Sequence, residues 1–168
     1  MCNVKKAAVF FGTGYEEIEA LTVVDLLRRT DIEVTCVAID GQKQVMGAHH
    51  INVDMDAAIE GLDFDSFDIL VCPGGMPGTK NLEACKALTD QLKRFYESGR
   101  LIGAICAAPQ IFGHLGFLKN RKACIYPGME AELGTSDIDI PDYFEYEADV
   151  TDYSAPEGIT VATNDVFN

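Results

Sequence analysis

The residues LIGAICAAP, numbers 101–109, join an apolar run to a helical pattern through a single cysteine. Leu101 to Ile105 predicts a short buried strand, and Ala107 to Leu115 has helical character. Small residues around Cys106 allow strand and helix to approach closely at a sharp turn. This is the arrangement of a nucleophile elbow, in which the reactive side chain stands at the turn. We therefore predict that Cys106 is a nucleophile.

The rest of the chain alternates strand-like and helix-like segments. This alternation predicts an α/β fold, with a central, mostly parallel sheet and helices on both faces. Two further helices are expected, over Glu16 to Thr30 and Asn81 to Glu97. The remaining strands are expected at Lys6 to Phe11, Glu33 to Ile39, His50 to Val53, Asp68 to Cys72, Lys122 to Tyr126, Tyr146 to Tyr153 and Ile159 to Thr163. The last two can form a hairpin around Ala155 to Gly158. We expect one domain over residues 1–168.

Two glycine-rich segments also follow predicted strands, GTGYEEIE at 12–19 and PGGMPG at 73–78. Ligands of open α/β sheets bind beyond the carboxyl ends of the strands, so these segments are expected to meet Cys106 there. The backbone N–H groups of Gly75 and Ala107 are candidates for an oxyanion hole. Glu19 is expected to face inward from its helix, whereas Glu16 and Glu17 are expected on the surface.

Glu19 is the expected proton partner of Cys106. A helix that begins at the cysteine favours the thiolate. A carboxyl group beside a thiolate has a raised pKa, because two negative charges disfavour each other. A protonated Glu19 then donates a hydrogen bond to the sulfur and lowers the pKa of the cysteine. The pair shares one proton, which can move to a substrate, and the same donor can stabilise a sulfinate.

Taken together, GYEEIEA, PGGMPG and GAICAAP resemble the DJ-1/ThiJ/PfpI superfamily, and its DJ-1/ThiJ branch most closely. The resemblance runs from the first strand to about Thr163. It implies a flavodoxin-like fold, of the class I glutamine amidotransferase-like kind, and a homodimer. It also implies that Cys106 is the reactive cysteine, Glu19 the conserved glutamate and Gly75 the oxyanion-hole glycine. Members are described as glyoxalases, protein deglycases, chaperones and oxidative-stress sensors.

The sequence departs from the family pattern in three places. Some members have His-Pro where this chain has Tyr126-Pro127, and tyrosine is a poor base at neutral pH, which counts against glyoxalase-type chemistry. Ala107 replaces the histidine of the protease-like branch, which argues against a peptidase. The family's C-terminal helix is expected to be missing, because the chain stops at Asn168; either the chain is truncated or a partner covers that sheet face. Tyr126, Gly74 and Asp25 are possible supporting residues, although Asp25 equally fits an exposed helix position.

The composition excludes several classes of partner. The 168 residues carry a net charge of -14, which disfavours nucleic acid and anionic membranes. The sequence has no apolar run of about 20 residues and no export signal, so we expect a cytoplasmic protein with its six cysteines reduced. Without CxxC spacing or a dinucleotide fingerprint, we expect no metal and no other cofactor. His49 and His50 are adjacent and would point to opposite faces of a strand.

Three functional hypotheses follow. The first is an enzyme acting on small or protein-bound reactive carbonyls, with Cys106 as nucleophile and Glu19 as proton shuttle. The second is a non-catalytic oxidative-stress sensor or redox-regulated chaperone that uses the same cysteine. The third is a hydrolase of the amidotransferase or peptidase type. This third hypothesis needs a histidine base, and the sequence places none of the three histidines for that role.

Overall fold

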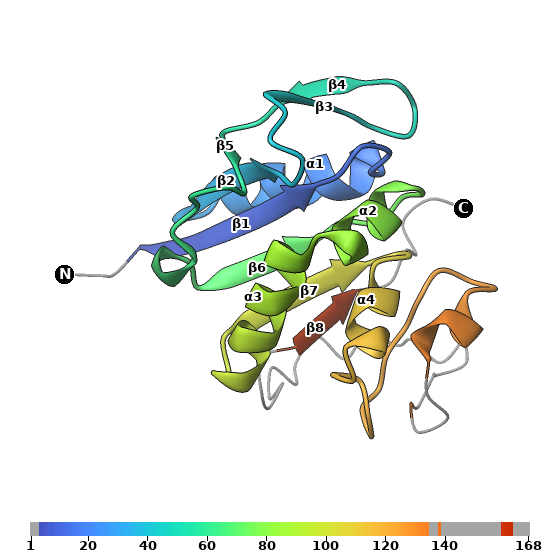
Figure 1. Cartoon of the computed structure of the whole chain (residues 1–168). Helices are drawn as coiled ribbons and strands as arrows, with labels where there is room; N and C mark the ends of the chain where they lie inside the picture. The colour runs from blue at the N-terminus through green and yellow to red at the C-terminus, as the bar shows by residue number, and fades with distance from the viewer. Residues whose placement is uncertain (1–3, 135–137, 139–158, 163–168) are drawn as a thin grey trace.

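The computed structural model describes residues 4–134, 138 and 159–162, which form a layered α/β fold (Figure 1). A six-stranded sheet has the order β5-β2-β1-β6-β7-β8, and every pairing in it is parallel. Its strands are β1 (Lys5–Phe11), β2 (Ile32–Ala38), β5 (Ala57–Ala58), β6 (Ile69–Cys72), β7 (Leu101–Ile105) and β8 (Ile159–Ala162). The predicted flavodoxin-like α/β class is therefore confirmed.

Helices cover both faces of the sheet. The helices are α1 (Glu17–Arg28), α2 (Gly78–Ala84), α3 (Lys86–Glu97) and α4 (Pro109–His114), with 3₁₀ turns at Phe64–Ser66 and Glu130–Leu133. Along β1, Phe10 packs in the apolar cluster that contains α2, α3 and α4, whereas Val9 packs in the cluster that contains α1. Leu88, Leu92 and Phe95 of α3 are fully buried, and each such side chain contributes about 1.5–3 kcal/mol to folding.

A small hairpin stands at one edge of the sheet (Figure 1). It consists of β3 (Gln44–Met46) and β4 (Asn52–Asp54), which pair antiparallel. The sequence predicts only one strand here, His50 to Val53, and misses β3 and β5. Both strands of the hairpin have three residues, too few for a period of two to be recognised in the sequence. The loop between them lies beside the start of α1, because Ala48 N donates to Tyr15 O at 2.8 Å.

Two other predicted elements are corrected. The single helix over Asn81 to Glu97 is two helices, because Cys85 has an extended backbone with ψ 95°. The strand over Lys122 to Tyr126 is absent, and within this segment only residue 122 forms a bridge. Ala123 and Ile125 are buried there, so the apolar alternation reports packing and not strand pairing.

Several expectations fall on parts of the chain that are not described. The strand at Tyr146 to Tyr153, the turn at Ala155 to Gly158 and the end of the chain after residue 162 lie outside the described residues. Strand β8 is described, and it pairs parallel with β7.

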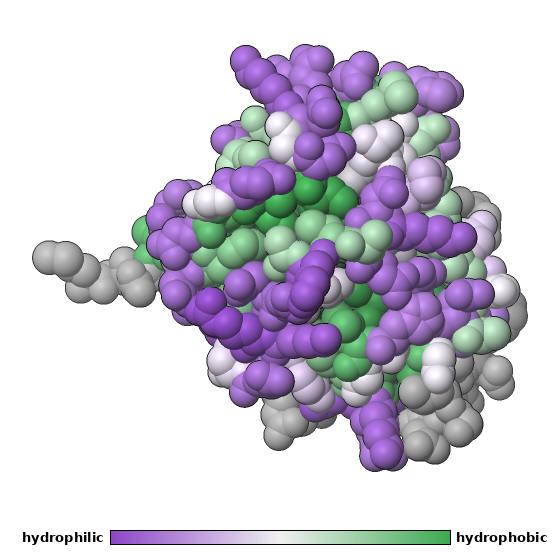
Figure 2. All heavy atoms as spheres, viewed as in Figure 1, coloured by the Kyte–Doolittle hydropathy of each residue, from purple (hydrophilic) through white to green (hydrophobic). Residues whose placement is uncertain are grey.

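The surface is mostly hydrophilic on the face that carries α2 and α3, with a band of hydrophobic residues over β1 (Figure 2). On the α1 side of the sheet, an apolar groove of about 260 Å³ is lined by residues that include Val23, Leu27, Ile69, Val71 and Leu101. Among the helices of the described residues, none has the length and apolar character needed to cross a membrane.

Candidate active site around Cys106

Cys106 occupies a strained turn directly after β7. Its φ of 61° lies in the left-handed region, which a residue with a Cβ adopts at a cost of about 1–3 kcal/mol. The side chain is 8% exposed. Helix α4 begins only at Pro109 and has six residues, so the expected helix start at the sulfur is replaced by individual amides. The backbone N–H groups of Ala107 and Gly75 donate toward the sulfur.

Glu19 lies against Cys106, on the first turn of α1. It is 7% exposed, it forms a hydrogen bond with the Cys106 thiol, and its Oε2 accepts from Gly74 N at 3.1 Å. Gly74 itself is confined between the two partners. A Cβ at this position would lie 2.5 Å from Glu19 Oε2 and 2.7 Å from Cys106 Cβ. The structure thus brings together five of the predicted site residues, Cys106, Glu19, Gly74, Gly75 and Ala107, and shows why position 74 needs a glycine.

Gly74→Ala is expected to separate the cysteine from the carboxyl group. The added methyl group overlaps both partners, and overpacking of this kind costs about 1–3 kcal/mol. We expect the pH profile of Cys106 alkylation to change while the protein still folds. Gly99→Ala is the control, because φ +70° makes it strained although nothing lies within 4 Å. It should lower the thermal midpoint and leave the profile unchanged. A wild-type profile in Gly74→Ala would contradict this reading.

Burial dominates the titration of the cysteine. It raises the pKa of the Cys106 thiol to about 12, and the hydrogen bond and negative charge of Glu19 contribute to the rise. The amides of Ala107 and Gly75 lower the pKa, but by less. This direction is opposite to the one expected from the sequence, because the expectation underestimates burial and assumes a neutral Glu19. Two buried negative charges side by side repel each other, so the pair holds one proton and titrates as a unit.

The remaining predicted residues have smaller parts in the site. Tyr126 touches the turn through its backbone, since its N–H donates to Cys106 O at 2.8 Å, and its side chain is half exposed. Asp25 forms an ion pair with Arg29 at 2.7 Å, and 59% of its side chain is exposed. Of the two readings of Asp25, the exposed helix position fits this contact.

The chain is similar to known proteins over most of its length. The model of the DJ-1/PfpI family matches residues 5–152, which include Cys106, Glu19 and both glycine-rich segments. The chain belongs to the DJ-1/PfpI family. Its likeness to solved structures agrees: "Toxoplasma gondii DJ-1, oxidized" is 27% identical with a TM-score of 0.81, over 95% of this chain and 82% of that one.

Two curated DJ-1/PfpI relatives are informative. Protein DJ-1 homolog B of Arabidopsis thaliana is 36% identical over 126 residues, which is 74% of this chain and 29% of the plant protein. Glutathione-independent glyoxalase DJR-1.2 of Caenorhabditis elegans is 35% identical over 111 residues, which is 66% of this chain and 59% of that protein. The chain spans less than a third of the length of the Arabidopsis relatives that it matches.

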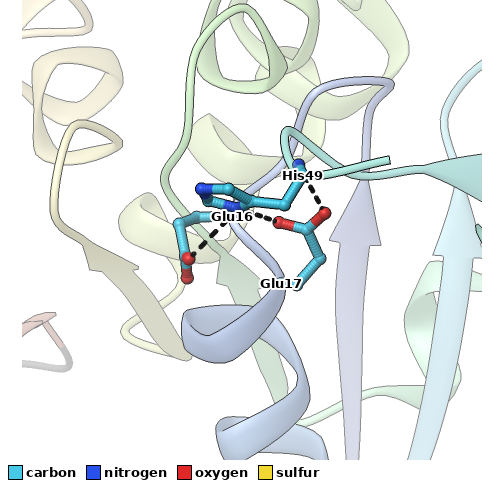
Figure 3. A group of neighbouring side chains, drawn as sticks. All are labelled: Glu16, Glu17 and His49. Carbon is cyan, nitrogen blue, oxygen red and sulfur yellow. Dashed lines mark hydrogen bonds and ion pairs between the residues drawn. The ribbon is translucent and has the colours of Figure 1, made fainter. Parts of the chain in front are cut away.

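Beside this DJ-1/PfpI site lies a cluster that the sequence did not reveal: Glu16, Glu17 and His49 (Figure 3). Glu17 is 3% exposed, so the expectation that it lies on the surface is wrong. His49 comes from the β3–β4 loop, and the sequence predicts a strand only on the β4 side of this loop. Possible metal-ligand atoms of the three residues lie within 4.8 Å of one another. His49 Nδ1 is hydrogen-bonded to Glu17 Oε2, and a metal ion would have to replace this bond.

The three histidines of the chain are all described, and two of them pair with glutamates other than Glu19. His49 pairs with Glu17, His114 pairs with Glu83 at 2.5 Å, and His50 is exposed with φ 65°. The amidotransferase or peptidase hypothesis requires a histidine that takes a proton from the nucleophile. His49 and His114 are each engaged by a glutamate, and the contact at the Cys106 sulfur is made by Glu19.

Proposed function

We propose that this chain is a cysteine-dependent DJ-1-like protein that acts on reactive carbonyls, with α-oxoaldehydes and their protein-bound adducts as the substrate class. The observation that carries the proposal is the surroundings of the Cys106 sulfur, which has the Glu19 carboxyl as a proton partner and the amides of Ala107 and Gly75 as anion donors. A relative named glutathione-independent glyoxalase supports this reaction class.

The first step is addition to the aldehyde carbon. Glu19 takes the thiol proton, and the Cys106 sulfur forms a bond to the carbon while the C=O π electrons move to oxygen. The amides of Gly75 and Ala107 hold the oxyanion, and preorganised donors of this kind lower the barrier by about 3–4 kcal/mol each. Glu19 then returns its proton to the oxygen, which gives a hemithioacetal.

The second step transfers a proton between neighbouring carbons. The Glu19 carboxylate removes the proton from the hemithioacetal carbon and delivers one to the former ketone carbon, through an enediol. The first carbon is oxidised to a thioester and the second is reduced to an alcohol, so no external oxidant is needed. Water then hydrolyses the thioester, which releases a 2-hydroxy acid and restores the thiol. We also propose a homodimer, as the family resemblance implies, and a cytoplasmic location, as expected from the sequence.

An oxidative-stress sensor is the second candidate, because the same donors suit an oxidised cysteine. Peroxide oxidises a thiolate to a sulfenate and then to a sulfinate, with one peroxide reduced to water at each stage. The Glu19 carboxyl and the amides of Ala107 and Gly75 can hold sulfinate oxygens. The half-exposed Tyr126 hydroxyl is a poor base, which favours this candidate relative to turnover.

Mild peroxide is expected to convert Cys106 to a sulfinate before the other cysteines react. Cys72 is an internal control, because burial raises the pKa of its thiol to about 12 as it does for Cys106, but Cys72 is fully buried and only burial shifts its pKa, whereas Glu19 and two amides act on the Cys106 sulfur. Mass spectrometry of digested protein measures each site. Uniform modification of all six cysteines would count against sensing.

A further inference from the structure

The side chain of Glu17 is enclosed although it stands at the start of a helix. His49 N donates to Glu17 Oε1 at 2.7 Å, and His49 Nδ1 lies 2.8 Å from Glu17 Oε2 (Figure 3). A Cβ on Gly47 would overlap the same carboxyl group. The His49 side chain is 70% exposed, so the loop covers Glu17 with its backbone and with one edge of the imidazole. Besides its own backbone N–H, Glu17 is therefore held by the β3–β4 loop.

Further contacts connect this loop to the active-site carboxyl group. Ala48 N donates to Tyr15 O and Gly14 N donates to Met46 O, both at 2.8 Å, so the loop is joined to the turn before α1. Glu16 N donates to Gly74 O at 2.9 Å. The Glu16 side chain then caps the helix, because its Oε2 accepts from Glu19 N at 2.8 Å. The start of α1 is thus fixed between the hairpin loop and the segment that faces Cys106.

The electrostatics favour this contact. Burial raises the pKa of Glu17, but the hydrogen bonds from His49, together with backbone hydrogen bonds from Glu17 itself and from Ile51, lower the pKa overall. The hydrogen bond with Glu17 raises the pKa of His49, and Glu16 Oε1 lies 3.9 Å from the same nitrogen. Loss of the imidazole removes the partner of Glu17 Oε2, which is unfavourable for a buried carboxylate, while His49 N still donates to Oε1.

We propose that Glu17 and His49 are positioning residues that hold the start of α1 so that Glu19 stays against Cys106. The proposal rests on the coupled Cys106–Glu19 pair of the proposed function. Neither residue touches the sulfur in the contacts described above. Their effect is transmitted by the first turn of α1, in which Glu19 follows Glu17 by two residues. The role of Glu17 and His49 is to keep the Glu19 carboxyl group at hydrogen-bonding distance from the Cys106 thiol.

A double-mutant cycle on the full chain tests the proposal. The readout is the alkaline midpoint of Cys106 alkylation by iodoacetamide, which reports thiol ionisation without any carbonyl substrate. Glu19→Gln shifts this midpoint when the two groups are coupled. In the His49→Ala background we expect Glu19→Gln to give about half of that shift or less. If His49 holds Glu19 against Cys106, its loss weakens the Cys106–Glu19 contact, and the two substitutions are then not additive. His49→Gln keeps an amide donor for Glu17 and should restore most of the shift.

His50→Asn is the matched control. It is the neighbouring exposed histidine, and asparagine tolerates its φ of 65°. This variant should show the full wild-type shift. An equal shift in wild type and His49→Ala would overturn the positioning role and leave the proposed function intact. A Glu19→Gln change without any shift in wild type would overturn the coupled pair, and with it both proposals.

Discussion

Cys106→Ser is expected to abolish conversion of methylglyoxal to lactate, with a fall in kcat/KM of about 1,000-fold or more. Serine is nearly isosteric with cysteine, so the positive φ at 106 and the contact with Gly74 are retained. Its hydroxyl is a far weaker acid, and Glu19 cannot ionise it in the way that it shares a proton with the thiol. The measurement is a steady-state rate for free methylglyoxal and for its hemithioacetal adducts.

Cys85→Ser is the control for this loss. Cys85 is half-buried at the junction of α2 and α3, where serine also suits the start of a helix. It should retain the wild-type rate. Two results would contradict the carbonyl proposal: a Cys106→Ser variant with a rate near that of wild type, or a wild type without activity on any α-oxoaldehyde or glycated thiol. The second result would leave oxidation of Cys106 as the candidate role.

The sequence was a good guide to the strands that carry the site. Strand β7 has the predicted bounds, β1 and β6 differ from prediction by one residue at one end, and β2 differs by one residue at each end. Buried parallel strands are predicted from continuous apolar runs, and such a run is recognised from a few consecutive residues. The glycine-rich segments likewise predicted the loops of the site, because Gly74 and Gly75 have no room for a side chain. These signals are local, and local signals survive in a single sequence.

The parts that were missed depend on contacts between distant segments. Glu17 and His49 are 32 positions apart, and nothing in either neighbourhood shows that the β3–β4 loop covers the helix start. The predicted direction of the Cys106 pKa shift was wrong for the same reason. A helix start and a carboxyl group can be predicted from the sequence, but the 8% exposure of Cys106 is a property of the whole fold. Burial outweighs the amides, and its size is known only once packing is known.

Glu19→Gln is expected to move alkylation and turnover in opposite directions. The negative charge of Glu19 and its hydrogen bond raise the pKa of the Cys106 thiol, so their removal lowers it. The alkaline midpoint of alkylation should fall from the region of about 12 by at least about one pH unit, which corresponds to 1.4 kcal/mol. Turnover should decrease by about 100-fold or more, because an amide cannot carry the proton between substrate atoms.

These opposite changes separate a proton shuttle from a group that only activates the sulfur. If Glu19 acted solely by making the thiol more reactive, alkylation and turnover would change together. If the Glu19 carboxyl group were purely structural, Glu19→Gln would lower the thermal midpoint and would change alkylation and turnover only weakly. Glu16→Gln is a suitable comparison, because its amide oxygen can still accept from Glu19 N. Because that bond keeps the first turn of α1 in place, Glu16→Gln should preserve turnover, whereas Glu19→Gln should lose it. An equal loss of turnover in both variants would assign the effect to charge near the helix start and not to proton transfer.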